Sequence, residues 1–452
     1  MQSPKLIVFV CLCALTLSGW SAPASAQKKD RVNPPTPELL PHTPYSDVQR
    51  DALLNGLQIV TLERSGESRL RCELVIRSGA MFDLAGKAGL AVMTQETLLA
   101  AAPQLTEELD SLQAKLEWGI NLDLTWFRLE APLDGFDTAM GIIGRLLVVE
   151  NIRPESFNRA QQARLAQLKA RAAKLTPAER ADEKFLAELY GDHPYGHSVE
   201  GNERTATAIT RSDVIDFYKR FYLANNSAVV VLGNVKHERV MRAFKTSFGG
   251  WVKGPIVPAT FRQPPRTTKV RVVEVEASDA PAVEWRGGVI GVKRADPDFV
   301  IAALMARVLE ARLKKDADEL RGSVTVKAPP RVLSGPLLMA AAVPPERAAE
   351  FSRRATDAYA SLATTPVTEE ELAAAKASLI SEHEAQPIIE HLREMEAYNL
   401  PRNHALNFMA RVNPITTADV QRVANRLRET NALTVVVLGR VSNQPKSQTP
   451  DK

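Results

Sequence analysis

Cysteine is scarce in this sequence. Only three occur among 452 residues, and Cys11 and Cys13 lie within the first 26 positions. If those first 26 residues are removed, Cys72 is the only remaining cysteine and has no partner for an internal disulfide. A single cysteine in an alternating apolar stretch is more often a small buried hydrophobic residue than a nucleophile. A disulfide framework is therefore excluded, although a chain of this length can form large hydrophobic cores without one.

An excess of charge of one sign is also lacking. The 57 lysines and arginines face 53 acidic residues, which gives a net charge of +4. Proteins that bind the phosphate backbone of nucleic acids usually carry a clear excess of positive charge. This chain does not, so we expect no nucleic-acid partner. The sequence also contains no glycine-rich phosphate loop and no nucleophile elbow. A serine or cysteine hydrolase is thus unsupported, and the 45% hydrophobic composition is that of an ordinary globular protein.

Long apolar runs are confined to the N-terminus. Lys5 precedes the run from Leu6 to Leu17, and the small residues at 24–26 are typical of a signal peptidase site. We therefore expect residues 1–26 to be a signal peptide, cleaved after Ala26, and the protein to be exported, most simply to the periplasm. The run is shorter than the about 20 residues that a spanning helix needs. No later stretch approaches that length, so no membrane span is expected in the mature chain.

Proline-rich and glycine-rich breaks divide the remaining chain. Residues 27–47 read as a polar linker, residues 249–265 as a second linker and residues 442–452 as a flexible tail. The breaks predict an N-terminal domain at 48–248 and a C-terminal domain at 266–441.

The two predicted domains contain a repeat. Residues 209–235 and 415–441 align without a gap at an offset of 206, and twelve of the 27 positions are identical. In each copy a threonine stands three residues before an aspartate, which predicts a capped helix start followed by a helix of about three turns. Both copies end in VVVLG, which is typical of a buried strand. The capping pairs are Thr210 with Asp213 and Thr416 with Asp419.

A second pair of segments supports the repeat. Helix starts are predicted at 154–157 and 368–372, with Phe157 matching Leu372 at an offset of 215. The extra residues of the first domain fit the loop at 191–196. Because strands and helices intermix in both domains, we predict an α+β fold of two related domains, each a sheet packed against helices. The predicted early strands are 70–77, 122–129, 270–275 and 337–343.

Four segments together resemble one known family. They are RSGAMFDLAGKAGLA at 77–91, GDHPYGHSVEG at 191–201, the two T-x-x-D-V…VVVLG segments and the helix start TEEELAAAKASL. The chain resembles the insulinase, pitrilysin and mitochondrial processing peptidase family of zinc metallopeptidases. The resemblance implies two homologous domains, each a mainly antiparallel sheet packed on helices, arranged as a clamshell as in LuxS-like and processing-peptidase structures. It also implies that extended peptides bind between the domains.

Active members of that family carry H-x-x-E-H on a helix and a further glutamate downstream as zinc ligands and general base. Here the helix at 90–99 presents Val92, Gln95 and Glu96 instead. Valine has no lone pair, and a neutral amide does not accept the proton of a metal-bound water as a carboxylate does. The downstream helix has no Asp or Glu from 157 to 178. We therefore expect no catalytic residue, no metal site and no cofactor, where active relatives hold zinc.

The resemblance also implies a substrate-holding Arg and Tyr in the second domain of some members. Anchored on Gly322, those positions are Asp318 and Thr325 here. Arg321 lies one helical turn from Asp318 and is a possible replacement for the arginine.

The acid-free helix carries basic residues that share one face, at Arg164, Arg171 and Lys174. A solvated helix face explains such a pattern more simply than a function does. The alternative is that these residues, with Arg321, bind an acidic peptide or a partner.

Two histidine groups are possible metal sites. His193 and His197 are better explained by a structural turn. The second group is interrupted by Pro387, and its i, i+3 pair is an ordinary solvated helix pair. Its members are His383, Glu384, Glu390, His391 and Glu394.

These observations favour an exported, non-catalytic homologue of the pitrilysin and insulinase peptidases, acting as the scaffold or peptide-chamber subunit beside a zinc-bearing relative. Two alternatives remain. One is a metallopeptidase with an unorthodox site that uses Glu96, a loop histidine or the group around His383 and His391. The other is a stand-alone peptide-binding or envelope-assembly protein.

Overall fold

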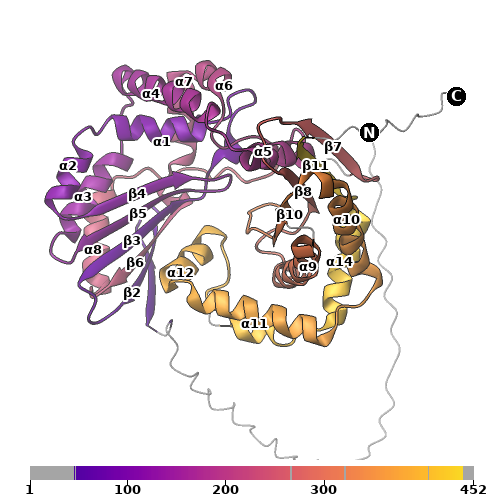
Figure 1. Cartoon of the computed structure of the whole chain (residues 1–452). Coiled ribbons are helices and arrows are strands. Elements are labelled where there is room, and N and C mark those ends of the chain that lie inside the picture. The colour runs from indigo at the N-terminus through magenta and orange to yellow at the C-terminus, as the bar shows by residue number, and fades with distance from the viewer. Residues whose placement is uncertain (1–44, 46, 265–266, 320–321, 406, 441–452) are drawn as a thin grey trace, which may run out of the picture. The chain divides into compact units, whose positions relative to one another are not determined.

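Two β-sheets with matching strand order organise the computed structural model (Figure 1). The expected signal peptide, Arg321 and the expected flexible tail lie outside the residues that the structure describes. Those residues are 45, 47–264, 267–319, 322–405 and 407–440.

The first sheet belongs to the first half of the chain, residues 45–248. Its order is β1-β2-β6-β3-β5-β4, with β2 and β6 parallel and the other neighbours antiparallel. The strands are β1 Val48–Ala52, β2 Gln58–Glu63, β3 Arg69–Ile76, β4 Lys115–Ile120, β5 Thr125–Pro132 and β6 Ser227–Gly233.

The second sheet belongs to the second half, residues 267–440. Its order is β7-β11-β8-β10-β9, with β7 and β11 parallel and the other neighbours antiparallel. Apart from β1, this order repeats that of the first sheet, which confirms the predicted α+β fold with two related sheets. The strands are β7 Arg271–Glu276, β8 Val283–Ile290, β9 Ser323–Lys327, β10 Pro336–Val343 and β11 Thr434–Gly439.

The VVVLG segments lie at equivalent positions. Strand β6 pairs with β2 and β3 and is buried along its whole length, and β11 pairs with β7 and β8. Each strand ends in a glycine with an unusual positive φ, +153° at Gly233 and +155° at Gly439. The repeated sequence therefore has a repeated backbone conformation as well as a repeated place in the sheet.

Helices of the first half pack on its sheet and on one another. Helices α3 and α8 pack together beside β5 and β2, while α1 contacts both α4 and α7. The bounds are α1 Leu90–Ala100, α2 Leu105–Ser111, α3 Phe136–Leu147, α4 Pro154–Ala172, α6 Glu203–Ala208, α7 Arg211–Phe221 and α8 His237–Phe248.

Helices of the second half form a separate hydrophobic core. Helix α9 packs on β9 and β10, α10 packs on β8, and α9 contacts both α11 and α14. The bounds are α9 Phe299–Glu319, α10 Ala348–Thr364, α11 Glu369–Ala385, α13 Phe408–Val412 and α14 Thr417–Thr430.

Both predicted capping pairs are present. The Asp213 amide donates to the Thr210 hydroxyl while the Asp213 carboxylate accepts from the Thr210 amide at 2.7 Å. Thr416 and Asp419 repeat the arrangement, with the equivalent amide-to-carboxylate distance at 3.0 Å. These reciprocal bonds satisfy amides at each helix start that the helix itself leaves unpaired.

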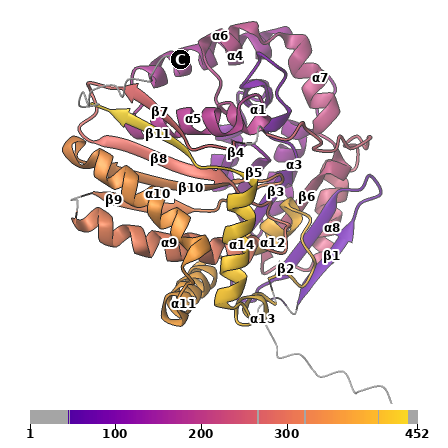
Figure 2. The ribbon, with the colours of Figure 1, turned by 90° about the vertical axis from the view of Figure 1, so that its right-hand side faces the viewer.

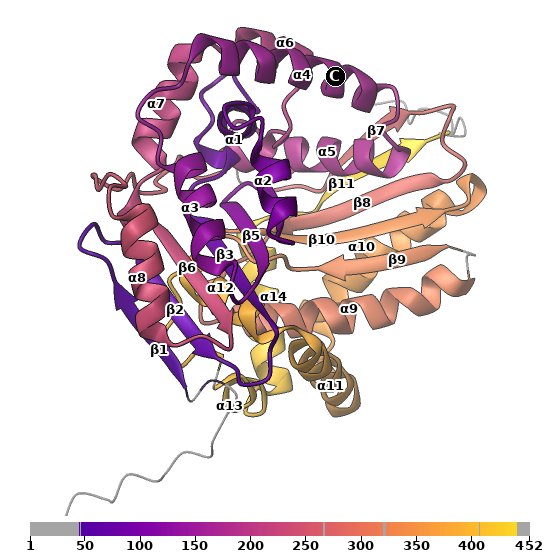
Figure 3. The same ribbon diagram turned by 90° about the vertical axis from the view of Figure 1, so that its left-hand side faces the viewer.

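Two helices are exchanged between the halves. Helix α5 (Pro177–Tyr190) of the first half packs on β8 and β11 of the second sheet (Figure 3). Helix α12 (Ile388–Ala397) of the second half packs on β3 and β6 of the first sheet (Figure 2). Each follows the long helix of its own half, α4 or α11, so the exchange is reciprocal and joins the halves through apolar contacts.

Two predicted elements differ from the structure by more than one residue, while the other predicted strands agree to within one residue. The helix expected through 157–178 ends at Ala172, and α5 begins at Pro177 after a threonine cap. Strand β5 covers 125–132 rather than 122–129, because the side chain of Asn121 accepts from the amides of Asp123 and Leu124 and forms a turn there. Within the described residues, no helix is both long and apolar enough to cross a bilayer.

Candidate functional site

The helix at the expected zinc-motif position is α1, and a glycine and a hydrogen-bonded carboxylate fix its start. Gly89 precedes it in the left-handed region with φ +92°. The Asp83 carboxylate accepts from the amides of Gly89 at 2.7 Å and Ala91 at 2.8 Å. Burial raises the pKa of Asp83 to about 7, opposed by these backbone hydrogen bonds. Helix α1 therefore begins at a defined point and orients the three motif positions.

Val92 and Gln95 are both buried on this helix, with exposed fractions of 9% and 3%. The Gln95 amide nitrogen lies 3.5 Å from the carbonyl oxygen of Gly119 on the edge strand β4, at the long limit of a hydrogen bond. Val92 thus contributes packing, and Gln95 contributes a weak hydrogen bond to the sheet. Neither contributes a group that accepts a proton or binds a metal strongly.

Glu96 faces the neighbouring helix α4. Its Oε1 atom accepts from Nη1 of Arg164 at 3.3 Å, while Oε2 is buried without a partner among the described residues. Burial raises the pKa of Glu96, and the charge of Arg164 opposes that shift. The cation beside this carboxylate is therefore a guanidinium that belongs to the chain itself.

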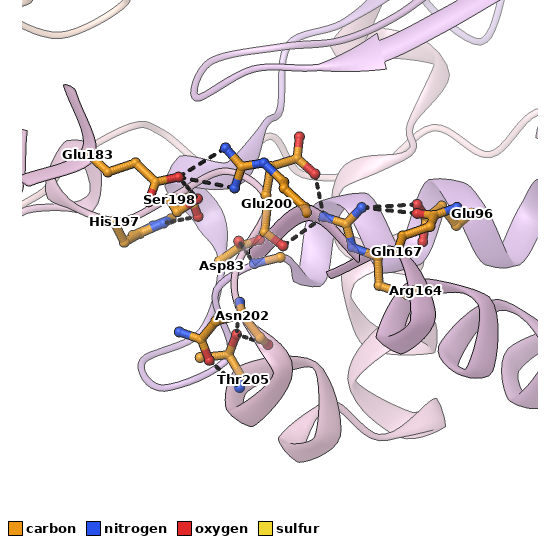
Figure 4. Close-up of polar contacts among 12 residues, drawn as sticks. Asp83, Glu96, Arg164, Gln167, Glu183, His197, Ser198, Glu200, Asn202 and Thr205 are labelled. Carbon is orange, nitrogen blue, oxygen red and sulfur yellow. Dashed lines mark hydrogen bonds and ion pairs between the residues drawn. The ribbon is translucent and has the colours of Figure 1, made fainter. Parts of the chain in front are cut away.

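Arg164 is buried, with 5% of the residue exposed. Its Nη2 donates to the Glu200 carbonyl at 2.7 Å and also pairs with the Glu200 carboxylate. Figure 4 shows the guanidinium between Glu96 and Glu200. Arg164 does not belong to a solvated face, because two carboxylates from other segments enclose it.

The loop at 191–201 brings Glu200 to this place. Gly201 has φ +68°, and a Cβ atom there would lie 2.1 Å from the Ala88 carbonyl oxygen. A Cβ at Gly89 would lie 2.8 Å from the Glu200 carbonyl oxygen. The segments at 77–91 and 191–201 are thus in contact through two glycines whose neighbours leave no room for a side chain.

This donor set does not fit zinc. A catalytic zinc needs three protein ligands with free lone pairs in a fixed geometry. The corresponding positions offer valine, a weakly bonded amide and a carboxylate already paired with arginine.

The other predicted site residues are dispersed. Arg171 pairs with Glu183 of α5 at 3.1 Å, and Lys174 is exposed beyond the end of α4. Asp318 lies in the last turn of α9, and Thr325 is exposed on β9 opposite Ala340. A peptide-binding or partner-binding role for Arg171 and Lys174 stays a prediction.

The HPYGH segment forms a short 3-10 turn. The Nδ1 atom of His193 accepts from the Tyr195 amide at 3.1 Å and caps this turn. His197 Nδ1 lies 3.2 Å from the Ser198 carbonyl oxygen. Burial lowers the pKa of both histidines, so their neutral forms are favoured in this packed turn.

The second histidine group is more buried than the sequence suggested. His391 is 5% exposed, and its Nε2 donates to the His383 carbonyl at 2.9 Å, so the expected solvated helix pair is wrong. His404, which sequence reasoning missed, accepts from Arg294 Nη2 at 2.9 Å. Within the described residues, no three His, Cys, Asp or Glu side chains are arranged to hold a metal ion.

Comparisons with known proteins agree with this architecture. Residues 208–379 match the family profile described as the Peptidase M16 inactive domain. An uncharacterised zinc protease of Mycobacterium tuberculosis is 30% identical over 213 residues, 45% of this chain and 48% of the relative. These matches support the resemblance of the chain to the M16, or insulinase, family. The chain spans about half the length of the curated relatives that it matches.

Solved structures of similar proteins show the same fold. The Peptidase M16 inactive domain from Pseudomonas fluorescens superposes with a TM-score of 0.79 at 21% identity, covering 88% of this chain and 99% of that one. The periplasmic protease PqqL from Escherichia coli gives a TM-score of 0.72 at 13% identity, covering 87% of this chain and 47% of that one. The two-sheet architecture of this chain thus matches about half of the PqqL chain.

Proposed function

We propose that this chain is a non-catalytic M16 protein that forms part of a peptide-binding chamber together with a zinc-bearing relative. The observation that carries the proposal is the ion pair between Arg164 and Glu96. A metal that entered this position would have to displace a guanidinium that two carboxylates hold in a buried place. The valine and the amide at the two other motif positions supply no replacement ligand.

The proposed partner is supported by the motif positions of this chain. Val92 and Gln95 offer no zinc ligand, so a relative with an intact H-x-x-E-H motif would supply the zinc. In E. coli PqqL this fold covers about half of one chain, which is compatible with a second unit beside it. We also propose export through residues 1–26, which is supported by the apolar run and by the periplasmic description of PqqL.

Purification from the native host tests the pairing. We expect an M16 relative with an intact H-x-x-E-H motif to co-purify with this chain at a fixed ratio. A monomer that brings down no such relative would contradict the proposed subunit role and favour a stand-alone peptide-binding protein.

Metal analysis tests the non-catalytic assignment. The purified mature chain is expected to contain far less than one zinc per molecule and to leave unfolded peptides uncut. Stoichiometric zinc together with chelator-sensitive peptide cleavage would instead establish a metallopeptidase with an unorthodox site.

A further inference from the structure

A cavity of about 420 Å³ is lined by residues of both halves. Its volume lies within the range of roughly 300–1,000 Å³ that is usual for ligand pockets. Trp126 of β5 comes from the first half, while Phe299 of α9 and Tyr398, which follows α12, come from the second. The aromatic walls suit the side chains of an extended peptide.

Most of the cavity's arginines are already paired. In three of them the guanidinium lies 3.1 Å or closer to a carboxylate oxygen, and such tight pairs leave little positive charge for a ligand. The pairs are Arg294 with Glu394, Arg307 with Glu382 and Arg393 with Glu73.

Arg331 is different. Its nearest ion-pair contact among the described residues is Asp123 Oδ2, at 3.9 Å from Nη1. Nη1 reaches the Pro330 carbonyl only at 3.5 Å, and Nε has no partner among the described residues. Yet 23% of this side chain is exposed, and it lines both this cavity and an adjoining one of about 490 Å³.

Asp123 is a weak counterion for Arg331. Its side chain is fully buried, and its Oδ1 atom accepts from the Tyr195 hydroxyl. Burial raises the pKa of Asp123, although Arg331 and Tyr195 oppose that shift. Because the Asp123 carboxylate lies 3.9 Å away and already accepts from Tyr195, the guanidinium keeps the capacity to pair with an anion from the cavity.

The backbone around Arg331 is held in place by three tyrosine hydroxyls. Tyr398 donates to the Pro330 carbonyl at 3.2 Å, and Tyr190 donates to the Ser334 carbonyl at 2.9 Å. The Tyr195 hydroxyl accepts from the Leu333 amide at 3.0 Å. Because this loop is fixed from both halves, little ordering of the backbone is needed when Arg331 binds a ligand.

We infer that Arg331 binds a carboxylate of an extended peptide whose side chains lie against Trp126 and Tyr398. The inference rests on the proposed function, because it assumes that the chamber binds peptides. The carboxylate belongs either to the peptide's C-terminus or to an acidic side chain. Both sources have the same bidentate chemistry toward a guanidinium.

Calorimetric titration with three matched peptides separates the sources. The probes are acetyl-Ala-Phe-Ala-Leu-Ala as the free acid, the same peptide as its C-terminal amide, and the amide with glutamate in place of the central alanine. We expect at least one of the two acidic peptides to bind about tenfold more tightly than the neutral amide, as is typical of a charged hydrogen bond. Which of the two does so identifies the source of the carboxylate.

Substitution of Arg331 tests whether this residue binds the carboxylate. Arg331→Gln is expected to remove the advantage of the acidic peptides and to leave the amide's affinity unchanged, while Arg331→Lys keeps part of it. Arg307→Gln is the matched control, because it removes a cavity arginine whose charge Glu382 already neutralises. An unchanged thermal midpoint in Arg331→Gln shows that the fold is intact.

Two other outcomes have different meanings. Equal affinity for all three peptides, unaffected by Arg331→Gln, would overturn the role of Arg331 and leave the peptide chamber standing. Absence of binding for every peptide at millimolar concentration would count against the proposed peptide-binding function itself.

Discussion

The Arg393 guanidinium lies 3.1 Å from a carboxylate oxygen of Glu73, although Arg393 belongs to α12 of the second half and Glu73 to β3 of the first. Arg128 of β5 approaches the other Glu73 oxygen at 3.0 Å. Glu73 is 3% exposed, so its carboxylate is shielded from solvent, whereas the two arginines are partly exposed. The exchanged helix therefore carries a buried ionic contact as well as an apolar face.

Glu73→Gln is expected to lower the free energy of unfolding by about 2 kcal/mol or more, because two arginines then lose a buried counterion. The effect is smaller than for an isolated pair, since Glu390 lies within 3.3 Å of both guanidinium groups. Urea unfolding measures it. The control is Glu130→Gln, which breaks the half-exposed pair with Arg69 and should cost less than about 1 kcal/mol. Equal losses in the two variants would contradict a special role for the exchanged helix.

Local patterns made much of the fold predictable. The T-x-x-D caps and the VVVLG strands depend on neighbours within a few residues, and both appear where the sequence placed them. The exchange of α5 and α12 was not predictable, because an amphipathic helix packs equally well on either of two similar sheets. Only the joint geometry of both halves decides which sheet each helix covers.

The helix that carries Val92, Gln95 and Glu96 was predictable from the sequence, but the burial of Arg164 on α4 was not. The loss of zinc ligands at the three motif positions stays a prediction. The burial of Arg164 depends on Glu96 and Glu200, which are 68 and 36 positions away along the chain. Without those partners, basic residues on one helix face look solvated. The prediction of a solvated helix pair at His391 was wrong for the same reason. The sequence shows the break at Pro387 but not that α12 packs against the end of α11.

Arg164→Met is expected to lower the free energy of unfolding by about 3 kcal/mol, because Glu96 loses its only ion-pair partner among the described residues and Glu200 loses a buried one. Arg159→Met on the same helix should change stability by less than about 1 kcal/mol, since Arg159 is exposed. Chemical denaturation of both variants provides the comparison.

Coupling between Arg164 and Glu96 gives a sharper measurement. In a double-mutant cycle, adding Glu96→Gln to Arg164→Met should recover at least about 1 kcal/mol, because the unpaired carboxylate is removed. Strictly additive losses would show that the two side chains do not interact energetically, and the argument against a metal at this position would lose its support.

The repeated caps predict matched losses. Thr210→Ala and Thr416→Ala should each lower the free energy of unfolding by about 1 kcal/mol, the usual effect of deleting a threonine N-cap. Since the two caps belong to different halves, their effects should add in the double variant. Thr207→Ala is the control, because its exposed hydroxyl bonds only within its own helix. A loss at one cap alone would show that the two halves do not unfold as one cooperative unit.

The histidines beside the cavity predict a pH dependence of stability. Burial, followed by the charges of neighbouring cations, lowers the pKa of His404 to about 3 and that of His383 to about 4. His404 accepts from Arg294, which requires a neutral imidazole, and Arg411, His383 and Glu394 also surround it. In the unfolded chain each of these histidines binds a proton near pH 6.5. The stabilisation that the neutral histidines contribute is therefore complete above that pH. It is lost as the pH falls toward their folded-state pKa values of about 4 and about 3.

His404→Asn isolates the effect, because the asparagine oxygen still accepts from Arg294 but does not titrate. Buried carboxyl groups with raised pKa values, such as Asp83 and Asp123, have the opposite dependence in the same pH range. The informative quantity is therefore the difference in unfolding free energy between the variant and the wild type, measured in urea at pH 7 and pH 5. That difference should shift in favour of the variant at pH 5. If it stays constant, the imidazole of His404 is not held neutral against Arg294 by the fold.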